Sequence, residues 1–183
     1  MATIGILSLQ GGFAAHQRIL SALGHDTLLI KTPEQLLDIE GLVLPGGESS
    51  TQLKLIHHAK LFAPLIDYCQ SERPVFGTCA GLILLARDVR SPQQESLGQL
   101  DVVVERNAWG RQRQSFEARS EKMRWPMLFI RAPKIVSTGE HVEWVDTYQH
   151  EPVIVRQGNI FGATFHPELT DDMSIHQMIF GCG

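Results

Sequence analysis

Hydrophobic and polar positions in the first half of the chain follow two alternating patterns. Short apolar runs predict buried strands, and the segments between them predict helices. The predicted strands are Thr3–Leu9, Thr27–Lys31, Gly41–Leu44 and Pro74–Thr78, and the predicted helices are Phe13–Leu23, a short one from Pro33, Thr51–His58, Phe62–Cys69 and Gly81–Arg87. Strands that alternate with helices in this way are typical of a parallel sheet covered on both faces.

The second half is dominated by strand-like segments separated by turn residues. These segments are Leu100–Glu105, Phe116–Arg119, Met127–Ile130, Ile135–Ser137, Val142–Val145, Val153–Arg156 and Asn159–Phe165, and a short helix is expected over Asp172–Phe180. They predict an antiparallel extension of the parallel core, which makes the fold class α/β with a mixed sheet. The polar segment Ser91–Ser96 is interpreted as a loop rather than a linker, so residues 1–183 are predicted to form a single domain.

Composition and charge exclude several classes of protein. The 183 residues carry a net charge of −4 without a run of Lys or Arg, which argues against nucleic-acid binding. No apolar stretch approaches the roughly 18 residues that a membrane-spanning helix needs. The three cysteines, Cys69, Cys79 and Cys182, have neither paired nor zinc-site spacing, which indicates a reducing compartment. We therefore expect a cytoplasmic protein with no membrane or nucleic-acid partner, no metal and no cofactor.

One cysteine has a context that favours catalysis. Gly77-Thr78-Cys79-Ala80-Gly81 lies between an apolar strand and an apolar helix, and has the form G-x-C-x-G. This is the cysteine version of the nucleophile elbow, in which small neighbours permit a sharp turn at the carboxyl edge of a sheet. The alternative is a buried structural thiol, which is the interpretation we prefer for Cys69 and Cys182. The elbow makes Cys79 a candidate nucleophile.

A cysteine nucleophile needs a base, and the base needs an orienting group. His166 and Glu168 flank Pro167 after a strand-like run, and Pro167 biases His166 towards an extended backbone. In an extended segment, residues two apart point the same way, so Glu168 is expected to orient His166 while His166 faces Cys79. Taken singly, each is as well explained by packing or solvation. Together they predict a Cys-His-Glu triad.

Acyl transfer also requires hydrogen-bond donors for the developing oxyanion. The backbone N–H of Ala80 directly follows the nucleophile, which is the usual place for the first donor at an elbow. The second is expected from Gly46-Gly47, and in particular from Gly47, because glycine lets backbone amides approach a ligand closely. Pro45-Gly46-Gly47 alone is equally typical of an ordinary turn.

These motifs resemble a known family. Leu44–Ser50 (LPGGESS), Phe76–Leu82 (FGTCAGL) and Phe165–Leu169 (FHPEL) resemble the class I, triad-type glutamine amidotransferases. Further segments narrow the resemblance to the glutaminase subunits of pyridoxal 5′-phosphate synthase: Gly5–Gly11 (GILSLQG), Val103–Gln112 (VVERNAWGRQ), Ser115–Glu117 (SFE) and Ile130–Pro133 (IRAP). The resemblance runs from residue 3 to about residue 175 and is specific in its combination of motifs.

The resemblance implies a three-layer, flavodoxin-like enzyme that hydrolyses L-glutamine to glutamate and ammonia. The ammonia would pass to a (β/α)8-barrel synthase subunit in a large hetero-oligomer, and activity would be low without that subunit. By motif, Cys79, His166 and Glu168 form the triad. Glutamine binding is carried over to Gly46, Gly47, Glu48, Ser49, Arg106, Ile130 and Arg131. A cation at Arg106 or Arg131 would suit the α-carboxylate of glutamine, and Glu48 or a backbone carbonyl would accept from its α-ammonium.

Two rival interpretations remain. The first is another cysteine hydrolase on a similar fold, such as a PfpI/DJ-1-like protein or a γ-glutamyl hydrolase. The former group commonly has histidine directly after its cysteine, whereas this chain has Ala80. The second is a regulatory subunit that has lost catalysis, an idea that the complete set of Cys79, His166 and Glu168 does not support.

Overall fold

The computed structural model describes residues 1–106, 108 and 115–181. A seven-stranded sheet forms its centre, in the order β10-β11-β12-β4-β3-β1-β2. Its strands are β1 (Thr3–Leu7), β2 (Asp26–Ile30), β3 (Gly41–Leu44), β4 (Val75–Thr78), β10 (Glu143–Tyr148), β11 (Glu151–Gln157) and β12 (Ile160–Ala163). The strands from β2 to β12 pair in parallel, and β11 and β10 add to them antiparallel. This is the predicted mixed sheet, with the 2-1-3-4-5 order of flavodoxin-like folds in its parallel part.

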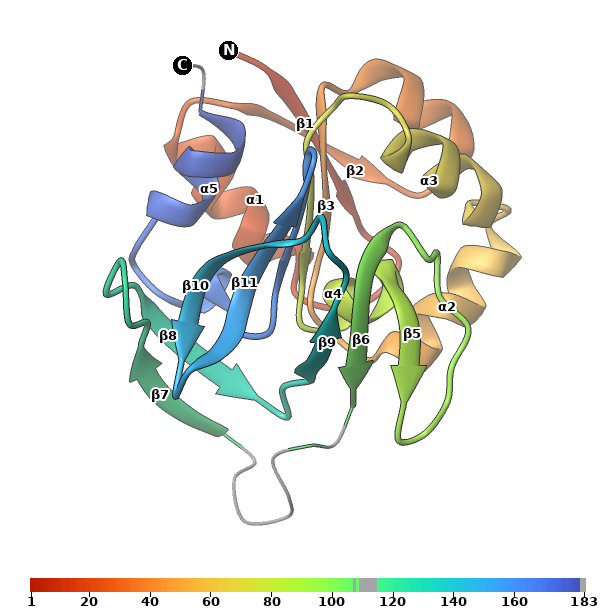
Figure 1. Cartoon of the computed structure of the whole chain (residues 1–183). Coiled ribbons are helices and arrows are strands. Elements are labelled where there is room, and N and C mark those ends of the chain that lie inside the picture. The colour runs from red at the N-terminus through yellow and green to blue at the C-terminus, as the bar shows by residue number, and fades with distance from the viewer. Residues whose placement is uncertain (107, 109–114, 182–183) are drawn as a thin grey trace.

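Helices cover both faces of this sheet (Figure 1). They are α1 (Phe13–Ala22), α2 (Ser49–His58), α3 (Phe62–Cys69), α4 (Ala80–Leu85), α5 (Ser174–Phe180) and the 3-10 helices η1 (Pro33–Asp38) and η2 (Pro167–Leu169). On one face, Leu20 of α1 and Ile179 of α5 pack with Ile6 of the sheet. On the other, Ile56 and Leu65, from α2 and α3, pack with sheet and α4 residues. Two apolar cores therefore enclose the sheet, and the fold has three layers.

The strands between residues 86 and 138 form two smaller sheets instead of extending the central one. One contains β5 (Ala86–Arg90), β6 (Leu100–Glu105) and β9 (Lys134–Thr138), and the other pairs β7 (Ser115–Arg119) with β8 (Pro126–Ile130). The predicted helix Gly81–Arg87 was wrong at its end, because α4 stops at Leu85 and β5 begins at Ala86. A six-residue helix is too short for its periodicity to mark where it stops.

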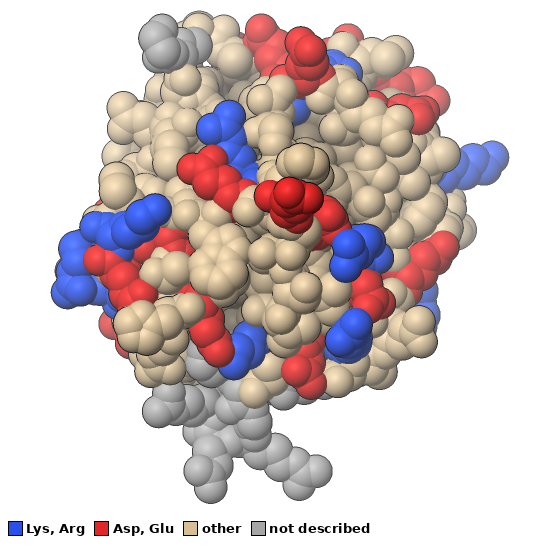
Figure 2. All heavy atoms as spheres, in the orientation of Figure 1, with Lys and Arg blue, Asp and Glu red and all other residues tan. Residues whose placement is uncertain are grey.

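Other predicted segments agree with the structure, with boundaries displaced by a few residues at most. Within the described residues, no helix is both long and apolar enough to cross a membrane. On the face that Figure 2 shows, basic and acidic side chains are interspersed rather than separated by sign. The parallel topology brings the ends of β3, β4 and β12 to one edge of the sheet, where the candidate residues lie.

Candidate active site

Cys79 lies in the sharp turn between β4 and α4, and its backbone has a φ of 47°. A left-handed conformation is strained for cysteine and costs about 1–3 kcal/mol. Cys79 N–H donates to the carbonyl of Ala163 at 2.9 Å, which ties the turn to β12. A Cβ at Gly81 would clash with the Leu44 carbonyl, so the small residue after the turn is required by close packing. The predicted nucleophile elbow is present.

His166 and Glu168 lie where β12 leaves the sheet, and they form the expected pair. His166 Nδ1 lies 2.7 Å from Glu168 Oε1, and both side chains are buried. The backbone differs from the expectation, because Pro167 begins the 3-10 helix η2 and Glu168 lies within it. Proline suits the first position of a helix. The carboxylate thus reaches the imidazole from a helical turn and not along an extended strand.

The electrostatics of the pair are those of an ion pair. Burial alone lowers the pKa of His166, but hydrogen bonding and charge interactions with Cys79 and Glu168 outweigh it and raise that pKa to about 10. Burial tends to raise the pKa of Glu168, and the neighbouring His16 and His166 instead bring it below its usual value. The imidazole is therefore stabilised as a cation next to the Cys79 sulfur.

The Gly46-Gly47 turn after β3 packs directly on the other two segments. A Cβ on Gly46 would clash with the His166 ring and lie 3.5 Å from Cys79 Cβ. Gly46 N–H donates to Thr78 Oγ1 at 3.1 Å, and its carbonyl accepts from Gly12 N–H at 2.9 Å. Because the Gly46 amide is already used, Gly47 and Ala80 remain the candidate oxyanion donors.

A cavity of about 460 Å³ opens over the sulfur. Its lining contains most of the predicted site: Gly47, Glu48, Ser49, Cys79, Arg106, Ile130, Arg131 and His166, together with Gln10 and Ile83. The volume is within the range of small-molecule sites. The structure therefore brings together residues from six separate segments of the chain. Asn107 and residues 109–112 of the Val103–Gln112 motif lie outside the described residues.

Two charged groups of the cavity, Glu48 and Arg106, bind each other. Glu48 Oε1 accepts from Arg106 Nη2 at 3.1 Å, and the same carboxylate caps α2 by accepting from the N–H groups of Ser50 and Thr51. Burial acts to raise the pKa of Glu48, but the hydrogen bonds from Thr51 and Ser50 lower it to about 2. The carboxylate expected to bind an ammonium group is thus also a helix cap, and Arg106 already has an acidic partner.

Three polar contacts of this site were not predicted. Gln10 Oε1 accepts from Glu48 N–H at 3.0 Å, and Gln94 Oε1 accepts from the hydroxyls of Ser49 and Ser50 at 3.0 and 3.1 Å. Gln10 follows β1, so the rule that ligands bind at the carboxyl ends of parallel strands marks it as a candidate. Gln94 belongs to the loop 91–96, and no local sequence signal indicates its contact.

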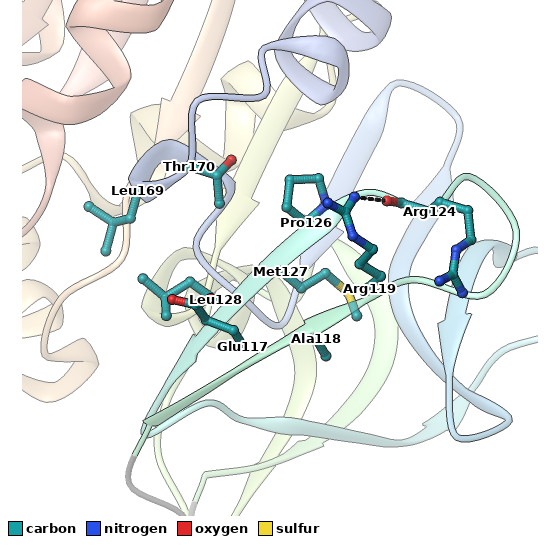
Figure 3. Close-up of a pocket in the computed structure, with 9 residues that line it drawn as sticks. All are labelled: Glu117, Ala118, Arg119, Arg124, Pro126, Met127, Leu128, Leu169 and Thr170. Carbon is teal, nitrogen blue, oxygen red and sulfur yellow. Dashed lines mark hydrogen bonds between the residues drawn. The ribbon is translucent and has the colours of Figure 1, made fainter.

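A second cavity, of about 600 Å³, lies between β7, β8 and η2 (Figure 3). Arg119 and Arg124 border it, and the Arg119 guanidinium donates to the Arg124 carbonyl at 3.0 Å. The side chains of Met127, Leu128 and Leu169 contribute apolar surface. No cysteine or histidine is among its described lining residues, so the smaller cavity at Cys79 is the candidate active site.

Comparison with known proteins supports this assignment. The chain matches the family model described as "SNO glutamine amidotransferase family" over residues 6–181. It is 48% identical over 179 residues to the pyridoxal 5′-phosphate synthase subunit PdxT of Thermotoga petrophila, covering 95% of each chain. The same-named subunit of Solibacter usitatus is 46% identical over 188 residues, with 97% of each chain covered.

A solved structure described as a glutamine amidotransferase superposes on the fold with a TM-score of 0.90. It is 39% identical in sequence, and the match covers 96% of each chain. The fold, the elbow and the sequence relatives agree with one another. The chain therefore belongs to the SNO glutamine amidotransferase family.

Proposed function

We propose that this protein is the glutaminase subunit of a pyridoxal 5′-phosphate synthase, and that Cys79, His166 and Glu168 are its catalytic triad. The observation that carries the proposal is the buried His166–Glu168 pair, 2.7 Å apart, beside a cysteine in a strained elbow. The elbow supplies a nucleophile, and the pair supplies a base already held in one orientation.

The reaction follows from these positions. The Cys79 thiolate attacks the carboxamide carbon of glutamine, and the Gly47 and Ala80 amides stabilise the oxyanion. The His166 imidazolium gives its proton to the departing ammonia, which leaves a thioester on Cys79. Neutral His166 then takes a proton from water as the water attacks the thioester carbon. Glutamate is released and the thiolate forms again.

Recognition of glutamine would use the charged rim of the cavity. Arg131 lies at the end of β8, and its neighbour Ile130 contributes a carbonyl 3.9 Å from the Cys79 sulfur. We propose that Arg106 or Arg131 binds the α-carboxylate and that Glu48 binds the α-ammonium. The Glu48–Arg106 ion pair would then rearrange as the substrate enters. Gly47 and Ser49 complete the wall of the site, and Gly46, which we propose as part of the same glutamine-binding turn, packs behind it against His166 and Cys79.

The partner is inferred from the relatives named as pyridoxal 5′-phosphate synthase subunits. We propose that the ammonia is passed to a (β/α)8-barrel synthase subunit within a hetero-oligomer. The described free thiols, Cys69 and Cys79, support a reducing compartment, and we propose the cytoplasm. The single three-layer architecture supports one domain over residues 1–183.

The first test replaces the nucleophile. Cys79→Ala is expected to abolish glutamate and ammonia release from L-glutamine, assayed with the synthase subunit of the same organism present. Cys69→Ala is the matched control, because Cys69 is also a buried thiol but its pKa is raised by burial to about 12 and it lies on α3. The control should retain activity. Hydrolysis that survives in Cys79→Ala would refute the triad.

The second test concerns the partner. Glutamine with ribose 5-phosphate and glyceraldehyde 3-phosphate should yield pyridoxal 5′-phosphate only when both subunits are mixed. Glutamine hydrolysis by the isolated protein should be slower than in the mixture. Equal rates of hydrolysis with and without the synthase subunit would contradict activation by the partner.

A further inference from the structure

A cluster of buried polar side chains lies behind the triad, on the side of Glu168 away from His166. His16 of α1, Thr78 of β4 and His176 of α5 are its members, and none of the three exposes more than a trace of surface. His16 Nδ1 lies 2.8 Å from His176 Nε2, and His16 Nε2 lies 3.2 Å from Thr78 Oγ1. His16 Nε2 is also 3.5 Å from Glu168 Oε2. The cluster therefore joins the first and last helices to the triad carboxylate.

The carboxylate determines where the protons of this cluster lie. Glu168 Oε1 is bound to His166, whereas Glu168 Oε2 is buried and has no hydrogen bond within the part of the chain that the structure describes. A buried carboxylate oxygen needs a donor close to it. His16 meets this need when its proton is on Nε2. Nδ1 of His16 then accepts, and Nε2 of His176 must donate to it.

Both histidines of the cluster are neutral in this arrangement. Burial lowers the pKa of His16, and it lowers the pKa of His176 to about 3, while the Glu168 carboxylate acts to raise both. His176 Nδ1 has no partner among the described residues, as expected for a nitrogen without a proton in an apolar setting. His16 therefore presents an N–H dipole to Glu168 and not a second positive charge.

The same imidazole contacts the support of the glycine turn. Thr78 Oγ1 accepts from Gly46 N–H at 3.1 Å while it faces His16 Nε2. Gly46 in turn packs on both His166 and Cys79. A shift of the His16 ring would thus displace both the Glu168 carboxylate and the turn that carries Gly47. Small displacements of this kind are costly in catalysis, because rates depend steeply on the placement of reacting groups.

We propose that His16 is a positioning residue for glutamine hydrolysis, because it fixes the positions of Glu168 and of the Gly46 turn. His176 in turn fixes the tautomer of His16. The inference rests on the proposed function and adds to it two residues that contact neither substrate nor sulfur. It predicts that loss of the Nε2 donor impairs the chemical step far more than glutamine binding.

The experiment compares His16 variants of the full chain with the synthase subunit present. His16→Leu removes the donor, and kcat should fall on the order of tenfold to a hundredfold with little change in KM. Because Glu168 then loses an interaction that favours its ionised form, the acid limb of the kcat profile should move to higher pH. His16→Gln can place an amide N–H near the former Nε2 position. This variant should therefore keep most of the wild-type kcat, and the acid limb of its pH profile should lie at the wild-type pH.

Two further variants separate positioning from folding. His16→Asn places its amide near the Nδ1 position and should be impaired even when its thermal unfolding matches that of His16→Gln. His25→Gln is the matched control, since His25 is also buried but precedes β2 at the opposite edge of the sheet, and it should keep the wild-type kcat.

The outcomes distinguish this inference from the proposed function. A wild-type protein that releases no ammonia from glutamine overturns the proposed function itself. An active wild type with a His16→Leu variant of unchanged kcat and pH profile overturns the role of His16. Equal impairment of His16→Gln and His16→Asn, with an unmoved acid limb, also overturns it, because it would show a packing role only.

Discussion

At the scale of single residues, Gly46 is held in place by three neighbours at once. Its N–H is bound by Thr78, its carbonyl by Gly12, and its Cα faces His166. No room is left for a side chain, since an added Cβ would lie 2.8 Å from His166 Nδ1 and still closer to the ring carbon. The glycine therefore sets how closely the turn and the base can approach.

Gly46→Ala should accordingly lower kcat by on the order of a hundredfold, because the His166 ring or the turn must move. Gly24→Ala is the control: its backbone is strained for alanine, with a φ of 84°, but it has open space around the added Cβ, so it lacks the steric clash found at Gly46. The control should lose about 1 kcal/mol of stability and keep its kcat. Equal losses of kcat in both variants would show that the effect is not local to the site.

The sequence predicted the proximity of those candidate residues that carry a local signature. Cys79 has small neighbours in a fixed pattern, and His166 and Glu168 are two apart, so short-range rules were enough. His16 and His176 are separated by 160 positions and look like any histidine on an amphipathic helix. Only the packing of α1 against α5 brings them together, and no single-segment pattern contains that information.

At the scale of elements, α2 begins with a cap that also serves the cavity. Glu48 accepts from the first free N–H groups of the helix and binds Arg106 across the pocket. The Gly-Gly-Glu-Ser motif predicted a ligand-binding turn, and the structure adds that the same turn starts a helix two residues earlier than Thr51. Cap and binding loop thus share a single acidic side chain.

Replacing this cap should affect stability in a pH-dependent way. Glu48→Ala should lower the free energy of unfolding by about 1 kcal/mol at neutral pH. Because the folded pKa of about 2 lies below the ordinary value of 4.5, the contribution is complete above pH 4.5 and is lost as the pH falls towards 2. Urea unfolding of the wild type and of Glu48→Ala at several pH values measures the difference between their free energies of unfolding. An exposed control, Glu140→Ala, should lose almost no free energy of unfolding relative to the wild type. A loss in Glu48→Ala that stays the same at acid pH would contradict the role of the ionised carboxylate.

At the scale of the whole molecule, His16 and His176 link stability at acid pH to the contact between α1 and α5. The pKa of His176 is about 3 in the fold, against 6.5 for a free histidine, so the unfolded chain binds more protons between these values. Stability should therefore decrease as the pH falls below 6.5. His176→Leu should show a flatter dependence in urea unfolding over this range, and parallel curves for the two proteins would contradict the prediction.

The distance along the chain between His16 and His176 has a consequence for synthesis. A ribosome makes the proposed nucleophile, Cys79, and the glycine turn well before Glu168, and it makes His176, which we propose to fix the His16 tautomer, later still. A nascent chain would therefore carry Cys79 for much of its synthesis without the histidine and the carboxylate that we propose to activate it. Under the proposed roles, full activity would be reached only once α5 docks beside α1, so the rate of glutamine hydrolysis would report on the docking of these two helices.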